Sequence, residues 1–400
     1  MERVFVVGMG MVSSIGMNLD DQLLSLRSGK SGIGPIQYLD SVHSNNFVAG
    51  EIPFSDQELK VQLGIDKEKI FNRASLFSIL AAKEAMKNAK ICDNETTKTV
   101  LISGNTLGGI SITEQYFNEE NKTGERIFSQ HSSTGESTET VADFIGGIDF
   151  CTTINTACSS SSNAIMLGAQ LIKAGRAERA FVGGCDSLAK FSLNGFNSLL
   201  LLDDEICKPF DQERKGLNLG EGAGYLVLES ESEMKKRNHH AIAELVGYCN
   251  ANDAYHSTAS SPDGNGAVLT MKGAIESAGL LPSDISFVHA HGTSTENNDL
   301  TEGRALEKVF ETVPKFMSSK SFVGHTLGAA GVINAIITLL SIKNQEVYPT
   351  INFTKSMPDL NIRPTSKWDN KVEINYALSN AFGFGGNNTS LVFSRINNIL

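Results

Sequence analysis

Cysteine, proline and long apolar runs are scarce in this 400-residue sequence. The six cysteines include no C-x-x-C pair, so their spacing gives no support to a zinc site. The first residues run from one arginine straight into an apolar segment and Gly8, unlike a signal peptide. No apolar stretch reaches the roughly 20 residues that cross a membrane. We therefore expect free thiols, no metal, no membrane span and a cytoplasmic protein.

Positive charge is also in short supply. Lysine and arginine number 34 against 45 aspartates and glutamates, a formal net charge of −11. Nucleic-acid phosphates are bound by basic faces, so this balance excludes nucleic acid as an expected partner. An acidic protein partner stays compatible with it, provided that a local basic patch exists.

The chain is rich in length, glycine and alternating apolar segments. Four hundred residues exceed one ordinary core, so we expect two domains or two fused halves. Strand-like and helix-like patterns alternate, which is typical of α/β layers. The expected strands are 4–7, 99–103, 152–155, 179–182, 224–228, 243–246, 287–290, 315–318 and 375–379. The expected helices are 76–89, 161–174, 268–278, 299–309 and 331–343.

Two glycine-rich turns, each leading into an apolar strand, echo one another at 219–228 and 382–393. The echo favours two related halves, and the polar, turn-rich stretch at 247–266 is the expected junction. We divide the chain into 1–247, which carries the candidate nucleophile, and 248–400, which carries the candidate histidines. The most polar segment, roughly 118–140, is expected to be a surface excursion or a partner-facing loop.

Cys158 is the first candidate for chemistry. It lies where a strand pattern ends and an alanine-rich helix pattern begins. Such a turn aims backbone N–H groups and the positive end of the helix dipole at the sulfur. That environment predicts a lowered thiol pKa, a reactive thiolate and donors for an oxyanion. The alternative for this residue alone is a buried structural thiol.

Two histidines follow in the second half. His291 comes just past a strand pattern, where the catalytic loops of α/β proteins lie, with Thr293 and Thr295 beside it. His325 precedes a small-residue helix, where the dipole disfavours a charged imidazole, so we expect it to be neutral. Lys320 lies five residues before His325 and could orient a charged group. Taken singly, each could be a structural or surface residue.

The last candidate is a turn of three glycines and two phenylalanines at 382–386, around Phe384. Its backbone N–H groups could complete an oxyanion hole, and the ring of Phe384 could gate a pocket. A plain turn between strands is the alternative for the glycines alone.

These segments, in this order, resemble the β-ketoacyl-carrier-protein synthases of the thiolase superfamily. The likeness also covers 6–13, Lys208-Pro-Phe-Asp211, Gly220-Glu-Gly-Ala-Gly224 and Asp253-Ala-Tyr-His256. It implies a thiolase-like, five-layered αβαβα fold built from two related halves. It also implies a homodimer, or a heterodimer with a related subunit, and no cofactor, because phosphopantetheine arrives on the acyl carrier protein as part of the substrate.

The resemblance assigns roles to the candidates. Cys158 would hold the acyl group as a thioester, and His291 and His325 would stabilise the enolate of a decarboxylating malonyl thioester. The N–H groups of Cys158 and Phe384 would hold the oxyanion, and Lys320 would support the histidines. The residues expected to bind substrate are Thr293 and Thr295, on the phosphopantetheine arm, and Phe196 and Ile110, which with Phe384 shape the acyl pocket. The carrier protein would dock on Lys67, Lys69, Arg73 and Arg126.

Several positions depart from the family pattern. Asn334 stands where a glutamate is usual, the region 118–145 is shortened, and the leucines of 198–202 replace a more polar stretch. These departures predict a specialised synthase of fatty-acid, polyketide or polyene type. They also keep open a pocket-shaping partner subunit with little activity of its own. A third reading is a cysteine hydrolase, which would release free acid.

Overall fold

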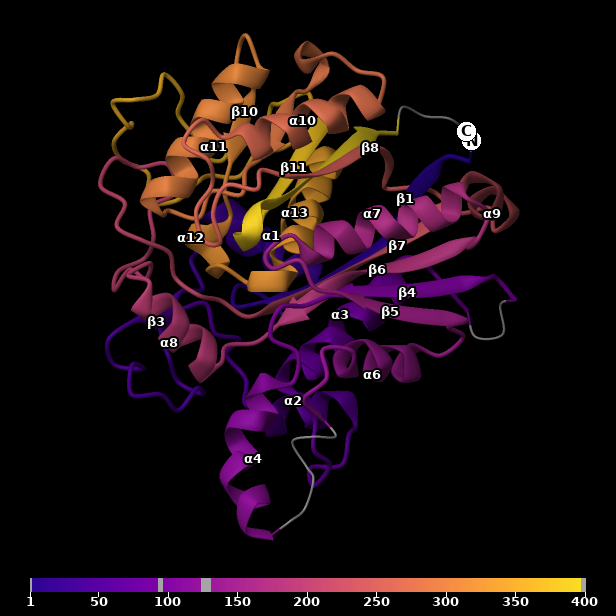
Figure 1. Ribbon diagram of the computed structural model, residues 1–400. Coiled ribbons are helices and arrows are strands. Elements are labelled where there is room, and N and C mark those ends of the chain that lie inside the picture. Colours follow the sequence, from indigo (N-terminus) through magenta and orange to yellow (C-terminus); the bar gives the residue numbers. More distant parts are fainter. Residues whose placement is uncertain (1, 93–95, 124–130, 397–400) are drawn as a thin grey trace.

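The computed structural model describes residues 2–92, 96–123 and 131–396 (Figure 1). Its dominant element is a ten-stranded mixed sheet in the order β10-β9-β11-β12-β8-β1-β7-β6-β4-β5. The strands of this sheet are β1 (Val4–Ser13), β4 (Thr99–Gly104), β5 (Phe150–Ile154), β6 (Arg179–Asp186), β7 (Gly222–Ser230), β8 (Ala243–Asn252), β9 (Phe287–His289), β10 (Lys315–Met317), β11 (Tyr376–Phe382) and β12 (Asn387–Arg395). A separate two-stranded sheet consists of β2 (Gly34–Pro35) and β3 (Val48–Ala49).

Helices connect the strands and cover the sheet. The α-helices are α1 (Leu19–Ser28), α2 (Asp56–Leu63), α3 (Arg73–Asn88), α4 (Ile110–Thr123), α6 (Glu136–Ile145), α7 (Ser160–Lys173), α8 (Lys190–Ser198), α9 (Glu231–Lys236), α10 (Asn265–Ser277), α11 (Glu296–Val309), α12 (Lys320–Val323) and α13 (Ala330–Asn344). Within the described residues, the short 3₁₀ turns are η1 (Pro282–Asp284), η2 (Leu327–Ala329) and η3 (Phe384–Gly386).

The sheet consists of two halves with one topology. From the junction outward the first half runs β1, β7, β6, β4, β5, and the second runs β8, β12, β11, β9, β10. In each half the first two pairings are antiparallel and the last two are parallel. The halves meet through a short antiparallel pairing of β1 with β8. Because strand order and direction coincide, the echo between 219–228 and 382–393 marks equivalent strands, β7 and β12.

The two halves of the sheet and the helices packed on and between them form five layers (Figure 1). α7 and α13 pack on one another in the middle, between the two parts of the sheet. α3, with α6 against it, covers the outer face of the first half, and α10, with α11 against it, covers the outer face of the second. The layers therefore follow the expected thiolase-like αβαβα order, and α7 and α13 bury the largest apolar cluster between them.

Every strand and helix expected from the sequence overlaps an observed element. The expected polar excursion at 118–140 is wrong in part, because α4 and α6 run through it. In α6 the buried residues Ser137, Val141 and Ile145 recur at helical spacing, and the intervening polar residues hid this stripe. The division at residues 247 and 248 stays a prediction. It falls inside β8, and the matched strand orders favour a division just before Ala243.

One segment of the described chain, Leu327–Asn344, is long and apolar enough to cross a membrane by composition alone. Its 18-residue window is 89% buried within the protein, since it includes the central helix α13. A helix that is apolar all round and enclosed on all sides is the pattern of a core helix.

Candidate active site

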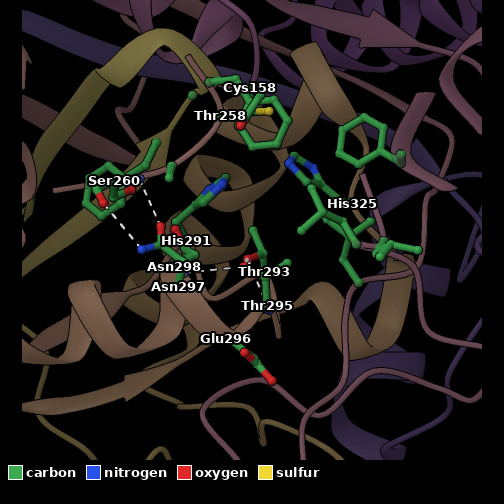
Figure 2. Close-up of a pocket in the computed structure, with 18 of the residues that line it drawn as sticks. Cys158, Thr258, Ser260, His291, Thr293, Thr295, Glu296, Asn297, Asn298 and His325 are labelled. Carbon is green, nitrogen blue, oxygen red and sulfur yellow. Dashed lines mark hydrogen bonds between the residues drawn. The ribbon is translucent and has the colours of Figure 1, made fainter. Parts of the chain in front are cut away.

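The candidate residues converge because they follow the carboxyl ends of parallel strands. Cys158 follows β5, His291 follows β9, Lys320 and His325 follow β10, and Phe384 follows β11. Equivalent topology in the two halves brings these strand ends to the same region between the layers. Cys158, His291, His325 and Phe384 line one pocket of about 360 Å³, and Figure 2 shows the sulfur and both imidazoles around the same cavity.

Cys158 sits in a tight turn before the central helix. Ala157 takes a left-handed φ of 53°, Ser160 N–H donates to Ala157 O, and α7 starts at Ser160. The thiol is buried, and this burial raises its pKa to about 11, opposed by the charge of Lys320 and the N–H of Phe384. The expected lowered pKa is therefore wrong for the free protein, because desolvation of a thiolate outweighs the nearby donors. The resting residue is a thiol.

Two backbone donors meet at the sulfur where the Phe384 turn packs on the Cys158 turn. The N–H groups of Phe384 and of Cys158 itself both interact with the sulfur. Gly383 makes this approach possible, since a Cβ there would lie 2.9 Å from Thr156 O and 3.2 Å from the Cys158 N. Two converging backbone donors beside a nucleophile stabilise the tetrahedral intermediate of acyl transfer.

His291 and His325 face each other edge to face, with ring centroids 5.3 Å apart. Burial, then the charge of Lys320, holds both pKa values well below the usual 6.5, so both rings are neutral. The Nδ1 atom of His325 accepts the Leu327 N–H at 3.2 Å, which leaves its proton on Nε2. His325 is thus a neutral hydrogen-bond donor, as expected, although burial rather than a helix dipole is the main cause.

Two carboxylates that sequence reasoning missed hold the His291 loop. Glu302 accepts the N–H of His291 and of Gly292, each at 2.8 Å, and Asp299 accepts the N–H of Ser294 and of Phe210. Both are fully buried on α11. Their signal was available: acids three residues apart on a helix, just after a candidate loop, share one face.

Lys320 is a buried cation among these groups. Burial lowers its pKa to about 8, opposed by the acidic groups Cys158, Glu302, Cys207 and Asp299. At residue 334, where the resemblance predicts a glutamate, this chain has a neutral asparagine. The Asn334 amide donates to Asn380 O at 2.9 Å and accepts from Ser319 Oγ at 3.4 Å. The carboxylates that balance Lys320 therefore come from α11.

We expect Lys320→Met to slow alkylation of Cys158 by iodoacetamide about tenfold at pH 7. Loss of the nearby positive charge raises the pKa of the thiol, and a rise of about one unit leaves a tenth of the thiolate. The difference should shrink above pH 9, where wild-type Lys320 has lost its proton. Lys308→Met, on the surface, is the control. Equal rates at pH 7 would contradict a role of this charge at the sulfur.

A network of amides and hydroxyls joins the nucleophile turn to the second half. Asn387 Oδ1 lies 2.7 Å from Ser159 Oγ, 3.0 Å from Asn163 Nδ2 and 2.7 Å from Asn250 Nδ2. Asn163 in turn donates to Thr156 Oγ1 at 2.8 Å. Because Asn387 ends the Phe384 turn, these bonds fix that turn against Cys158.

Asn387→Ala removes one acceptor that Ser159, Asn163 and Asn250 share. Each of these donors keeps another acceptor, so we expect a total cost of about 1–3 kcal/mol. We expect a lower urea midpoint and about tenfold slower turnover, because the Phe384 N–H drifts from the oxyanion position. Urea unfolding and single-turnover kinetics measure the two effects. The exposed Asn361→Ala should change neither.

The predicted substrate residues separate into two groups. Thr293 and Thr295 line the pocket, with their hydroxyl oxygens 2.9 Å apart, and Phe196 lines it with its ring stacked on Phe384 at 5.6 Å. Ile110 is not among the lining residues of this pocket; it is the first residue of α4. Its predicted place in an acyl pocket stays a prediction.

The predicted docking residues also differ in their surroundings. Lys67 and Lys69 are exposed, whereas Arg126 lies outside the described residues. Arg73 is turned inward: it pairs with Glu221 at 2.8 Å and with Asp56 at 2.7 Å, and its side chain is only 11% exposed. Glu221 comes from the Gly-Glu-Gly-Ala-Gly turn and also accepts the N–H of Ile52. The predicted docking role of Arg73 is therefore wrong, since its guanidinium is paired with Glu221 and Asp56 within the protein.

Comparison with known proteins decides the family. Residues 1–234 match the model of the β-ketoacyl synthase N-terminal domain, and residues 242–354 match that of its C-terminal domain. The chain belongs to the β-ketoacyl synthase family. It is 34% identical to 3-oxoacyl-[acyl-carrier-protein] synthase 2 of Staphylococcus aureus (strain COL), over 98% of each chain. It is an acyltransferase of the ketosynthase type.

Solved structures agree with this assignment. The ishigamide ketosynthase/chain length factor superposes with a TM-score of 0.91 at 29% identity, over 99% of this chain and 100% of that one. The ketosynthase of a type II polyketide system solved with its acyl-carrier protein, AntDE:AntF, superposes with a TM-score of 0.88 at 26% identity, over the same shares. This β-ketoacyl synthase is thus similar both to a 3-oxoacyl-[acyl-carrier-protein] synthase and to a ketosynthase of a type II polyketide system.

Proposed function

We propose that this β-ketoacyl synthase joins an acyl group held on Cys158 to the two-carbon unit of a malonyl thioester on an acyl carrier protein. The observation that supports it best is the joint arrangement around one cavity: a buried thiol, two backbone donors and two neutral imidazoles. Each component can form or stabilise a charge that develops in decarboxylative condensation.

In the first half-reaction the sulfur of Cys158 attacks the incoming acyl thioester. The new S–C bond forms, the C–S bond to the carrier arm breaks, and the arm leaves as a thiol with the proton that Cys158 lost. The N–H groups of Cys158 and Phe384 hold the oxyanion between the two events. Neutral His291 lines the same pocket, and its Nδ1 is unpaired in the resting state, so His291 would pass the proton.

In the second half-reaction the malonyl thioester loses carbon dioxide, and the electrons of the broken C–C bond form an enolate. His325 donates its Nε2–H to the enolate oxygen, and His291 provides a second contact. The enolate carbon then attacks the acyl-Cys158 carbonyl, a C–C bond forms, and Cys158 leaves as a thiolate. The thioester already activates the α-carbon, so the proposal needs no metal or redox group, and the phosphopantetheine belongs to the substrate.

The substrate arm would enter along Thr293 and Thr295, whose hydroxyls line the pocket. The exposed Lys67 and Lys69 are the predicted docking charges that the surface still offers to an acidic carrier protein. Reversing both to glutamate is expected to raise the KM for malonyl-carrier protein several-fold, most strongly at low salt. Unchanged KM values at every salt concentration would sink this docking site.

A second copy or a related subunit would cover the β5 edge. β5 ends the sheet, and Phe150 on it is 54% exposed, whereas the opposite edge strand β10 is capped by the Thr365 N–H on Phe316 O. An uncovered edge strand with an exposed aromatic is a pairing surface. Native mass spectrometry of the chain expressed alone distinguishes a homodimer from a subunit that needs a partner.

We place the reaction in the cytoplasm.

The decisive test is incubation with acyl- and malonyl-carrier protein, followed by intact mass and product analysis. We expect an acyl adduct on Cys158, release of carbon dioxide and a β-ketoacyl product. Release of carbon dioxide without an adduct would instead favour a pocket-shaping subunit. Free acid without a new C–C bond would favour a hydrolase.

A further inference from the structure

Leu200 occupies an unfavourable position at the mouth of the Cys158 pocket. It lies just after α8, in the left-handed region with φ of 57°, and it is 85% exposed. Leu201 N–H donates to Phe196 O and Leu200 N–H to Asn197 O, the pair of bonds that closes a helix in a Schellman motif. Glycine is favoured at that position because a Cβ there is strained.

Elsewhere the same chain closes helices in this conformation with glycine or with a polar side chain, as at Lys90 after α3, with φ of 50°. Gly29 and Gly64 end α1 and α2 in this conformation, with φ of 68° and 69°, and polar Gln345 does so after α13. Leu200 combines backbone strain with a large apolar side chain in water. Neither contributes to packing within the chain, and strain of this kind is typical of functional sites. Something outside the chain must therefore account for the side chain.

The position of Leu200 indicates what covers it. Leu200, Leu201 and Lys215 line the same pocket as Cys158, together with Thr258–Ser260 and Glu296–Asn298. Leu200 is exposed and Cys158 is buried, so Leu200 lies toward the outer end of this pocket. Any protein that delivers a thioester arm through this mouth must lie over the rim. Leu199, which is half-exposed, adds a second apolar side chain beside Leu200. Exposed Lys215 adds a positive charge suited to an acidic partner.

We propose that Leu200 is a docking contact for the acyl carrier protein, packing on apolar surface beside the attachment point of its arm. The proposal rests on the proposed function, since only a carrier-bound substrate brings a protein body to this mouth. A leucine clear of its own chain offers its whole side chain to the partner, which is how a few central apolar residues dominate interfaces.

The test compares carrier-bound and carrier-free substrates in Leu200→Gly and Leu200→Ala. We expect the KM for malonyl-carrier protein to rise about tenfold in both variants with kcat nearly unchanged. The KM for malonyl-pantetheine, which has no protein body, should stay the same. Because glycine relieves the left-handed strain, Leu200→Gly should melt no lower than wild type, which separates docking from a structural role. Leu281→Ala is the matched control, since Leu281 is also exposed, at 66%, and does not line the pocket.

Two outcomes would overturn the proposal. An unchanged KM for malonyl-carrier protein means that Leu200 makes no contact with the carrier. A parallel rise for malonyl-pantetheine means that Leu200 acts on the arm or the pocket and not on the protein body. Failure of the proposed function is a separate result, because wild type would then condense neither substrate.

Discussion

Cys158→Ala is expected to abolish condensation, with a loss on the order of 10⁴-fold or more, because no other group in the pocket can form the acyl thioester. Intact mass after incubation with acyl-carrier protein provides the direct measurement: wild type gains the acyl mass and the variant does not. Acylation should also quicken with pH in the wild type up to about pH 8, since burial raises the pKa of this thiol to about 11 and the thiolate fraction grows. The rise should flatten above pH 8, where Lys320 loses the charge that stabilises the thiolate.

The control for this experiment is Cys92→Ala, which removes an exposed thiol elsewhere. It should keep both the adduct and the turnover. An acyl adduct that persists in Cys158→Ala would move the nucleophile to another residue and would contradict the site described above.

His325→Ala is expected to slow decarboxylation of malonyl-carrier protein by about 10²–10⁴-fold, because the enolate loses its fixed Nε2–H donor. Acylation of Cys158 should continue, since its oxyanion is held by backbone N–H groups. Single-turnover release of labelled carbon dioxide measures the first effect, and intact mass measures the second. His325→Gln, which restores a side-chain N–H donor, should recover part of the rate.

The pH profile gives a second check on His325. Its pKa lies well below 6.5 because of burial, so decarboxylation by the wild type should show no imidazole inflection between about pH 5.5 and 7.5. An inflection near 6.5 that vanishes in His325→Ala would mean that the ring titrates during turnover. The exposed His256→Ala should leave the profile unchanged.

The duplicated topology explains why Cys158 and His325 meet. Cys158 precedes α7 in the first half, and His325 precedes α13 in the second, and these two helices pack together in the middle layer. The last strand outward in each half, β5 or β10, leads into each of these turns. One structural unit used twice thus brings Cys158 and His325 to the lining of one pocket.

The sequence by itself determined the class of architecture, the strands and helices with regular periodicity, and the four segments that carry the chemistry. These features are local: a strand end, a glycine turn or a small-residue helix start is written in a few adjacent residues. The order of the motifs along the chain carried the family resemblance. Cys158, His291, His325 and the Phe384 turn were all recognisable at this level.

Only the tertiary structure decided the properties that depend on distant residues. Burial reversed the expected pKa shift of Cys158, and Glu221 drew Arg73 away from the surface. The support of the His291 loop by Glu302, and of the Phe384 turn by Asn387, came from contacts across the fold. Desolvation and hydrogen bonding are set by everything packed around a group, so no local pattern reports them. The exposure and backbone strain of Leu200 are also visible only in the tertiary structure. They are the observations behind the proposed contact with the carrier protein.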